Sequence, residues 1–272
     1  MVKIGGALAP ENICGDIART RARGERLVVA HGGASEIARL ATELGVPQRT
    51  LTSPDGLTSR HTDPAMLDVI TLAMTGRVKP RLLRALAVHG VRAAGLTGLD
   101  AGLLTARRKA AQRTVRDGRT VVVRDDHSGR LVSVDPAVVR TLLDAGITPV
   151  LSPPAMGTDG RPLNVDADRV AAAVAAALGA ERLILLTAAP GVLRDASDES
   201  TVLTRCELPT EGAVPYAAGG GMHRKLVAAR TALLGGVAQV VIADGRVASP
   251  LGSALSGGGT RVIIRNPTEA TS

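Results

Sequence analysis

The 272-residue sequence predicts an α/β protein: a three-layer αβα sandwich around an open, mainly parallel sheet. Two observations lead to this class. Strand-like runs alternate with helical patterns along most of the chain, and these runs are apolar almost throughout. A strand that is apolar on both sides must be covered on both sides, as helices cover the faces of a parallel sheet. No repeat period or low-complexity linker divides the chain.

The first half of the chain begins with two strand–helix units. Strands are expected at 2–4 and 27–30, followed by helices at 11–23 and 35–44. The stretch 47–64 has no clear period and is expected to be irregular. Helical patterns resume at 65–75 and 80–89, and a strand is expected at 91–95.

A projecting basic β-hairpin is expected next, before the alternation resumes. Strands at 112–116 and 120–124 flank Asp117-Gly118, a favoured two-residue turn, and a second turn is expected at Ser128-Gly129. Further helices are expected at 136–144, 166–178, 222–234 and 250–255, and further strands at 148–151, 183–187, 240–243 and 261–264. The tail after Pro267 is expected to fray.

The composition narrows the class of protein. There is no Phe or Trp and one Tyr, so the core must consist of aliphatic residues, and a protein that binds nucleic acid by stacking on its bases is disfavoured. No uncharged apolar run approaches the roughly 18 residues needed to span a membrane, and the N-terminus is expected to enter a strand directly, without a signal peptide. Cys14 and Cys206 lack metal-ligand spacing, so a reducing cytoplasm is expected.

The net charge of +8 has two interpretations, a solvated basic surface or a surface that attracts an anionic partner. Part of the excess is local, because eight cations between positions 107 and 130 face three carboxylates. A basic hairpin of this kind is a candidate docking surface for an acidic protein. The cations are Arg107, Arg108, Lys109, Arg113, Arg116, Arg119, Arg124 and Arg130.

Two expected strands end in glycine pairs. Lys3 lies in the first strand, which runs into Gly5-Gly6, and the second runs into His31-Gly32-Gly33. A cation beside open backbone suggests a cradle for phosphate or carboxylate. The alternative is two turns that use glycine for a positive φ angle, although this leaves the lysine unexplained.

Two further segments carry candidate chemistry. Asn164, Asp166 and Asp168 lead into a helix, where either aspartate could also be an N-cap. The run 219–225 is a glycine-rich loop that ends in a helix start and delivers Lys225. The P-loop pattern GxxxxGK[ST] and the Rossmann pattern GxGxxG are both absent from the sequence.

Taken together, these motifs resemble the amino acid kinase superfamily, specifically its acetylglutamate kinase branch. The resemblance covers nearly the whole chain and implies phosphorylation of a carboxylate by ATP with Mg²⁺, without dedicated protein ligands for the metal. It implies that Lys3 and Lys225 flank the phosphoryl group and that Asp168 orients both lysines. Substrate contacts are implied for Gly32, Gly33, Arg60 and Asn164, and nucleotide contacts for Gly5, Gly6, Thr187, Gly221 and Met222.

Within that branch the sequence looks most like kinases whose substrate is carried by a small acidic LysW-type protein. The stretch from Gly56 to Asp63 resembles their G-x-x-S-R-x-T-D pattern, and Ala34 replaces a glycine typical of acetylglutamate kinases. The carried acid would be 2-aminoadipate or glutamate. The resemblance assigns carrier docking to Arg107, Arg108, Lys109, Arg113 and Arg124. Ala188 departs from the family, which has a polar residue there.

Several expectations follow from this resemblance. One domain of two lobes is expected, with acceptor binding by about 1–155 and nucleotide binding by about 156–272, and a homodimer is expected as in many family members. Two alternatives stay open. One is a kinase for free N-acetylglutamate, and the other is a catalytically silent nucleotide-binding regulator on the same fold. Retention of Lys3, Asp168 and Lys225 disfavours the silent protein, whereas Ala188 is consistent with it.

Overall fold

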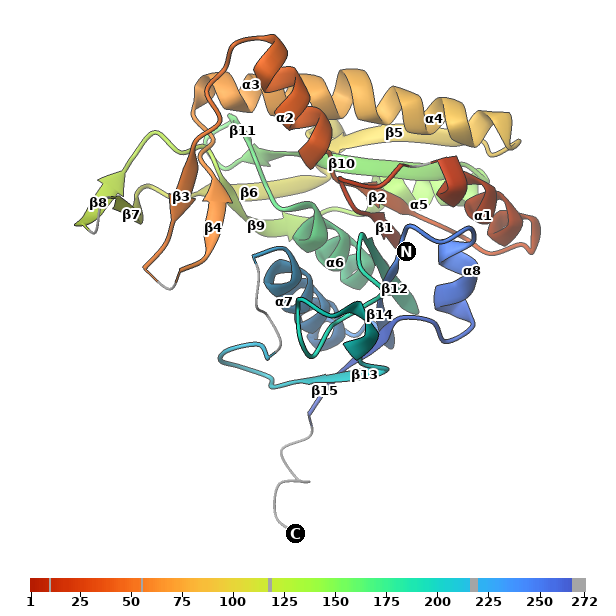
Figure 1. Cartoon of the computed structure of the whole chain (residues 1–272). Helices are drawn as coiled ribbons and strands as arrows, with labels where there is room; N and C mark the ends of the chain where they lie inside the picture. The colour runs from red at the N-terminus through yellow and green to blue at the C-terminus, as the bar shows by residue number, and fades with distance from the viewer. Residues whose placement is uncertain (10, 55, 117–118, 216–219, 266–272) are drawn as a thin grey trace.

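The computed structural model describes residues 1–9, 11–54, 56–116, 119–215 and 220–265, and its centre is an 11-stranded, mainly parallel sheet (Figure 1). Its order is β13-β15-β14-β12-β1-β2-β10-β6-β9, and β5 and β11 also pair with β10. Antiparallel pairs occur at β14–β15, β6–β9 and β10–β11. The strands are β1 Val2–Ile4, β2 Val29–His31, β5 Ala93–Gly98, β6 Leu104–Arg108, β9 Gly129–Val134, β10 Thr148–Gly157, β11 Pro162–Leu163, β12 Arg182–Thr187, β13 Arg205–Leu208, β14 Gln239–Asp244 and β15 Thr260–Ile264.

Helices cover both faces of this sheet, so the predicted three-layer αβα fold class is confirmed. Helices α1, α4 and α8 pack on one face, and α5, α6 and α7 pack on the other. The α-helices are α1 Glu11–Ala22, α2 Ala34–Glu43, α3 Pro64–Leu72, α4 Lys79–Val88, α5 Ala137–Asp144, α6 Ala167–Leu178, α7 Gly220–Leu234 and α8 Pro250–Leu255, with short 3-10 turns at Asp100–Gly102 and Glu199–Thr201.

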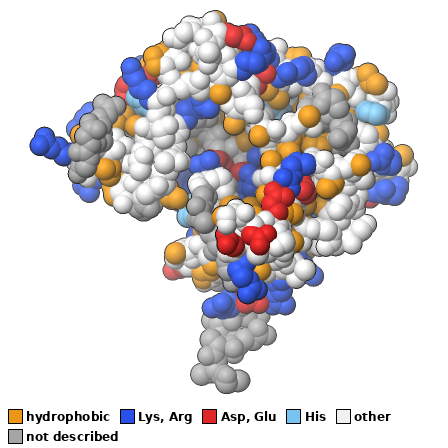
Figure 2. Space-filling model, in the orientation of Figure 1, with side chains coloured by type: hydrophobic (Ala, Val, Ile, Leu, Met, Phe, Trp, Pro, Cys, Tyr) orange, Lys and Arg blue, Asp and Glu red, His pale blue; other side chains and the backbone are white. Residues whose placement is uncertain are grey.

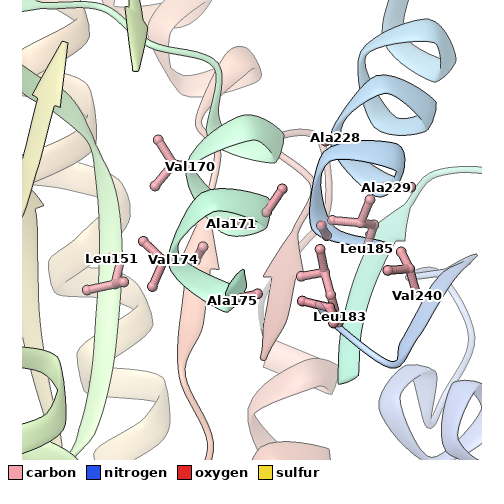
Figure 3. Close-up of a cluster of buried hydrophobic side chains, with 14 of the residues drawn as sticks. Leu151, Val170, Ala171, Val174, Ala175, Leu183, Leu185, Ala228, Ala229 and Val240 are labelled. Carbon is pink, nitrogen blue, oxygen red and sulfur yellow. The ribbon is translucent and has the colours of Figure 1, made fainter. Parts of the chain in front are cut away.

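The core is aliphatic, as the composition predicts. Figure 3 shows Val170 and Val174 of α6 near Leu151 of β10, while alanines of α6 and α7 occupy the space between the two helices and β12. Alanines at this contact let the two helices approach closely, which brings their N-terminal turns together at the end of the sheet. This contact places the two helix starts beside the end of β1.

Alternation along β1 determines where Lys3 points. Val2 and Ile4 belong to the core beneath α1, α4 and α8. Successive side chains of a strand point to opposite faces, so Lys3 faces α6 and α7. A lysine at a position where the neighbouring strands carry Ala30 and Leu185 is an exception to the apolar pattern of the sheet.

Two predictions about local structure are wrong, and a third is incomplete. The segment expected to be irregular contains the hairpin β3 Thr50–Thr52 and β4 Thr58–Arg60. The two helical patterns that follow it form one run, because a π-helical segment, Ala73–Val78, joins α3 to α4. The turn expected at Ser128-Gly129 does not close a second hairpin, since β9 pairs with β6.

The projecting basic hairpin is confirmed as β7 Gln112–Arg116 paired with β8 Arg119–Val123. It extends from one end of the molecule beside β3 and β4 (Figure 1). Its predicted turn at 117–118 and the predicted fraying of the tail lie outside the described residues. Within the described chain, no helix combines the length and apolar character needed to cross a lipid bilayer.

Candidate active site

Three charged side chains that are far apart in sequence meet at the end of β1. Asp168 lies in the first turn of α6, and its two carboxylate oxygens lie 2.7 Å from Lys3 Nζ and 3.0 Å from Lys225 Nζ. Asp166, not Asp168, is the N-cap of α6, because its side chain accepts from the backbone N–H groups of Asp168 and Arg169. Asp168 is therefore available to hold both lysines in fixed positions.

This charged cluster is almost completely buried. Lys3, Asp168 and Lys225 are 4%, 4% and 8% exposed. Burial alone would raise the pKa of Asp168, but the two ammonium groups outweigh it, so the pKa lies below the ordinary carboxyl value. Burial and the nearby Lys3 ammonium lower the pKa of Lys225, while Asp168 opposes this shift. With both lysines protonated the cluster carries a net charge of +1 in a dry environment, which favours an anionic ligand.

The glycine turns lie directly beside this cluster, and the alternative interpretation, that they use glycine for a positive φ angle, is wrong. None of Gly5, Gly6, Gly32 and Gly33 is among the glycines with positive φ. They are needed for close approach instead: a Cβ on Gly6 would lie 2.7 Å from Gly33 N, and one on Gly33 would lie 2.5 Å from Met74 Sδ. A Cβ on Gly32 would lie 3.8 Å from Lys3 Nζ, so this turn borders the charged cluster.

The backbone N–H of Gly32 is already used, since it donates to the Ile4 carbonyl at 3.1 Å. Its predicted donation to substrate therefore has no support in this structure. On the α4 side of the same turns lies a cavity of about 340 Å³, lined by Gly5, Gly6, His31 and Glu36 among others. Lys3, Asp168 and Lys225 do not line this cavity. The turn at Gly32 therefore borders both this cavity and the charged cluster.

Arg60 and Asn164 lie on segments that approach one another. Arg60 ends β4, is half-buried and forms no salt bridge within the described part of the chain. Its nearest polar contact is a long one to Gln48 at 3.4 Å, and burial lowers its pKa. A desolvated guanidinium with such weak partners is suited to bind a carboxylate. Asn164 donates to Thr62 Oγ1 at 3.1 Å, which joins the chain after β4 to the chain before α6.

The residues predicted to bind nucleotide lie on C-terminal elements. Thr187 ends β12 and is level with Asp244 of β14, whose carboxylate binds Arg246. Gly221 and Met222 occupy the first turn of α7, while Gly219 lies outside the described residues. The N-terminal ends of α6 and α7 converge on the charged cluster, and their helix dipoles favour phosphate there.

The cations assigned to docking separate into two groups. Arg107, Arg108 and Lys109 lie on or directly after β6, which is next to the edge strand β9, whereas Arg113 lies on the projecting hairpin and Arg124 directly after it. Arg108 has a structural role, because its guanidinium donates to the carbonyls of Asp126 and Arg124 at 2.9 Å and 2.7 Å. The docking prediction therefore rests on the other four. Figure 2 shows basic and hydrophobic side chains together on this projecting side of the molecule.

A comparison with protein families now identifies the class of enzyme. A model of the amino acid kinase family matches residues 1–244. The chain belongs to this family. A [LysW]-aminoadipate kinase of Deinococcus radiodurans is 40% identical over 266 residues, which cover 96% of this chain and 90% of that protein. An acetylglutamate kinase of Symbiobacterium thermophilum is 39% identical over 235 residues, which cover 85% of this chain and 77% of that protein.

The fold of this amino acid kinase also matches solved structures. The structure of smu.665 from Streptococcus mutans has a TM-score of 0.74, covers 96% of both chains and is 24% identical, so this match concerns the fold alone. The predicted family is thus confirmed by sequence, and the predicted fold class by structure.

Two features of the candidate site were not predicted from the sequence. The β3–β4 hairpin was missed because its strands are three residues long and alternate without an apolar face. Arg224 was missed because it precedes Lys225 in a run of basic residues, His223-Arg224-Lys225, and nothing in the run distinguishes one cation from the next. Its side chain donates to the Thr58 carbonyl at 3.1 Å and approaches Asp166 Oδ2 at 3.4 Å.

Proposed function

We propose that this amino acid kinase transfers the γ-phosphoryl group of ATP to the side-chain carboxylate of 2-aminoadipate or glutamate, which is attached through its α-amino group to an acidic LysW-type carrier protein. The observation that carries the transfer chemistry is the buried Lys3–Asp168–Lys225 cluster beside two glycine turns and two helix N-termini. The relative from Deinococcus radiodurans, named for the carried substrate, supports the choice of acceptor.

The reaction needs positioned charge and no proton transfer. A carboxylate oxygen attacks the γ-phosphorus, the bond from that phosphorus to the bridging oxygen breaks, and ADP leaves with the electron pair. The transferred oxygens carry negative charge throughout, and the ammonium groups of Lys3 and Lys225 offset it. Asp168 holds these two groups in place before substrate arrives, so little reorganisation is needed during transfer.

Mg²⁺ would enter with ATP, held by the phosphate oxygens. The described residues contain no group of three or more His, Cys, Asp or Glu side chains arranged to hold a metal ion. The donors next to the cluster are cations and backbone N–H groups, which suit the phosphates and not the metal. Binding of Mg²⁺ through the nucleotide fits this donor set.

The parts of the site divide between two lobes. Residues 1–155 would bind the acceptor, with Gly33 and Arg60 near its carboxylate and backbone. Asn164, which lies beyond that boundary, would also contact the acceptor. Residues 156–272 would bind the nucleotide through Thr187 and the start of α7. Asp244 of the neighbouring strand supplies a polar group beside Thr187, so the loss of one at Ala188 does not leave this edge apolar. We also expect a homodimer.

The carrier would dock on the projecting hairpin and the neighbouring sheet edge. Lys109 and Arg113 are exposed there, and Val122 is 52% exposed, which gives the surface both charge and apolar area. The hairpin is attached to the acceptor side of the site, because Thr114 of β7 exchanges two hydrogen bonds with the backbone of Thr52 in β3. A protein bound on this surface would therefore present its carried amino acid close to β4.

The deciding experiment compares two acceptors by hydroxamate trapping of the acyl phosphate. The acceptors are free N-acetylglutamate and a LysW-type carrier loaded with aminoadipate or glutamate. We expect turnover of the loaded carrier and poor turnover of the free acid, with a KM for the carrier that rises with salt, because screening acts over about 8–10 Å at 0.1–0.15 M salt.

A matched pair of variants tests the docking surface. The double variant Lys109→Ser with Arg113→Ser should raise KM for the carrier while leaving KM for ATP unchanged. The control, Arg84→Ser with Arg92→Ser, removes two exposed charges from the region of α4 and β5 and should behave as wild type. Efficient, salt-independent use of free N-acetylglutamate by wild type and both variants would reject the carrier and favour an acetylglutamate kinase.

A further inference from the structure

Arg224 connects three segments that surround the charged cluster. Its Nη1 donates to the carbonyl of Thr58 at the start of β4, at 3.1 Å, and its Nε lies 3.4 Å from Asp166 Oδ2. The side chain is 41% exposed, so it lies at the surface of the site and not in the core. We call this set of contacts the Arg224 bridge.

Each end of the Arg224 bridge is within two residues of a group assigned to the reaction. Thr58 precedes Arg60 by two positions on β4, and Asp166 precedes Asp168 by two positions at the start of α6. Arg224 itself is adjacent to Lys225 on α7. A single guanidinium thus fixes the relative positions of the acceptor hairpin and of both helix starts that carry the cluster.

The two contacts do not compete with the local structure. Asp166 uses Oδ1 to cap α6, which leaves Oδ2 for the Arg224 guanidinium. The contact at Thr58 is made to a backbone carbonyl, so it depends on the position of the hairpin and not on a side chain. The start of α7 lies in van der Waals contact range of β4, because a Cβ on Gly220 would lie 3.6 Å from Thr58 Oγ1.

We propose that Arg224 is a positioning residue that holds the β3–β4 hairpin against the start of α7, so that Arg60 faces the acceptor carboxylate while Lys225 faces the phosphoryl group. This inference rests on the proposed function for the roles of Arg60 and Lys225. It assigns Arg224 no direct contact with substrate. Loss of the bridge should therefore weaken acceptor binding and leave nucleotide binding intact.

The test uses Arg224→Met, Arg224→Lys and a control on the same helix. Arg224→Met keeps an apolar stem without donors, and Arg224→Lys keeps the charge but can serve only one of the two partners well. The control is Arg230→Met, because Arg230 also lies on α7 and donates to a carbonyl, that of Gly212 at 2.9 Å, away from the hairpin. We expect Arg224→Met to raise KM for the acceptor about ten-fold, consistent with loss of a charged hydrogen bond at a partly exposed site.

The other kinetic parameters separate positioning from direct binding. KM for ATP should change less than about two-fold, Arg224→Lys should restore part of the loss, and Arg230→Met should match wild type. A rise in KM for ATP with an unchanged acceptor KM would overturn the proposal and make Arg224 a nucleotide ligand. Wild-type behaviour of Arg224→Met would also overturn it and leave an ordinary surface arginine.

A second readout does not need the reaction. Trypsin can cut after Arg49 and Arg60, which flank the hairpin. Arg224→Met should be cut there several-fold faster than wild type and Arg230→Met, with the same melting temperature, because a released hairpin opens locally without global unfolding. If no acceptor is phosphorylated at all, the proposed function fails while this proteolysis still decides whether the bridge holds the hairpin.

Discussion

Replacing Asp168 with Asn tests whether one carboxylate holds two buried ammonium groups together. At an effective dielectric constant of about 20, each contact of 2.7–3.0 Å corresponds to about 5–6 kcal/mol of attraction before desolvation and lysine–lysine repulsion are subtracted. Broken buried ion pairs cost about 3–5 kcal/mol in net stability. We expect Asp168→Asn to lower the free energy of unfolding at pH 7 by that amount and to abolish turnover.

A second substitution separates loss of charge balance from loss of shape. In Asp168→Asn the buried charge rises from +1 to +2, and adding Lys225→Met returns it to +1. The double variant should regain about half of the lost stability, or about 2 kcal/mol, while remaining inactive. The control is the exposed pair of Arg26 and Asp144, where Asp144→Asn should change stability by less than about 1 kcal/mol.

The assay is denaturant unfolding followed by far-UV circular dichroism, since the chain has no Trp and one Tyr. The pH dependence gives an independent check. The folded-state pKa of Asp168 is lowered, so its contribution is present above the ordinary carboxyl pKa of about 3.9 and is lost as the pH falls through the folded-state value. The free energies of unfolding of wild type and Asp168→Asn should converge at acid pH. Equal free energies of unfolding for wild type and Asp168→Asn at pH 7 would refute the reasoning. So would a double variant in which the losses caused by Asp168→Asn and Lys225→Met simply add.

Three further predictions concern other residues. Lys225→Ala should lower kcat by about 100-fold. Burial and Lys3 lower the pKa of Lys225, so the kcat of wild type should decline with rising pH at a lower pH than the pKa of an ordinary lysine would give. Ala101 has φ 51°, so Ala101→Gly should stabilise the fold by about 0.5–1 kcal/mol in the same unfolding assay, whereas Ala145→Gly, at φ −76°, should destabilise it. Burial lowers the pKa of Lys79 to about 8, so above that pH the unfolded chain binds a proton that the folded chain has lost. The free energy of unfolding of wild type should therefore rise between about pH 8 and 10 relative to that of Lys79→Met, as measured by the same unfolding assay across that range.

Sequence patterns predicted the parts of the fold that are locally specified. The alanine-rich helix α6 is bounded by a capping aspartate, Asp166, and by Gly179 with φ 64°, and both are visible in the sequence. The hairpin of β7 and β8 has a favoured turn sequence between two strand-forming runs. These signals lie within a few residues of the structure that they determine, so no tertiary information is needed to read them.

Long-range pairing could not be predicted in the same way. Ser128-Gly129 has the composition of a turn, but β9 begins there and pairs with β6, so it extends the main sheet. Gly5-Gly6 and Gly32-Gly33 look like turns that need a positive φ, whereas the actual constraint is the approach of two backbones and of Met74. Such constraints come from neighbours that are distant in sequence.

The charged residues of the candidate site could be identified in the sequence, but the contacts between them could not. Lys3 was conspicuous because a buried strand has no structural use for a cation, and Asp168 followed from the resemblance to a known family. The connections of the acceptor side depend on tertiary contacts. Asp126 is buried and accepts from the backbone N–H of Thr62, and Thr62 in turn accepts from Asn164.

Under the proposed function, these connections would link the docking surface to the segment that holds the acceptor carboxylate. The projecting hairpin is bound to β3 through Thr114, and its base is bound to Thr62 through Asp126. Thr62 follows Arg60, the last residue of β4, by two residues. Thr58, the first residue of β4, is held by Arg224. Under the proposed function, a carrier bound at the projecting hairpin would therefore be linked by hydrogen bonds to the segment that holds Arg60, and through Arg224 to the helix that carries Lys225. A free amino acid makes none of the outer contacts, so it would lack the binding energy that orders this side of the site.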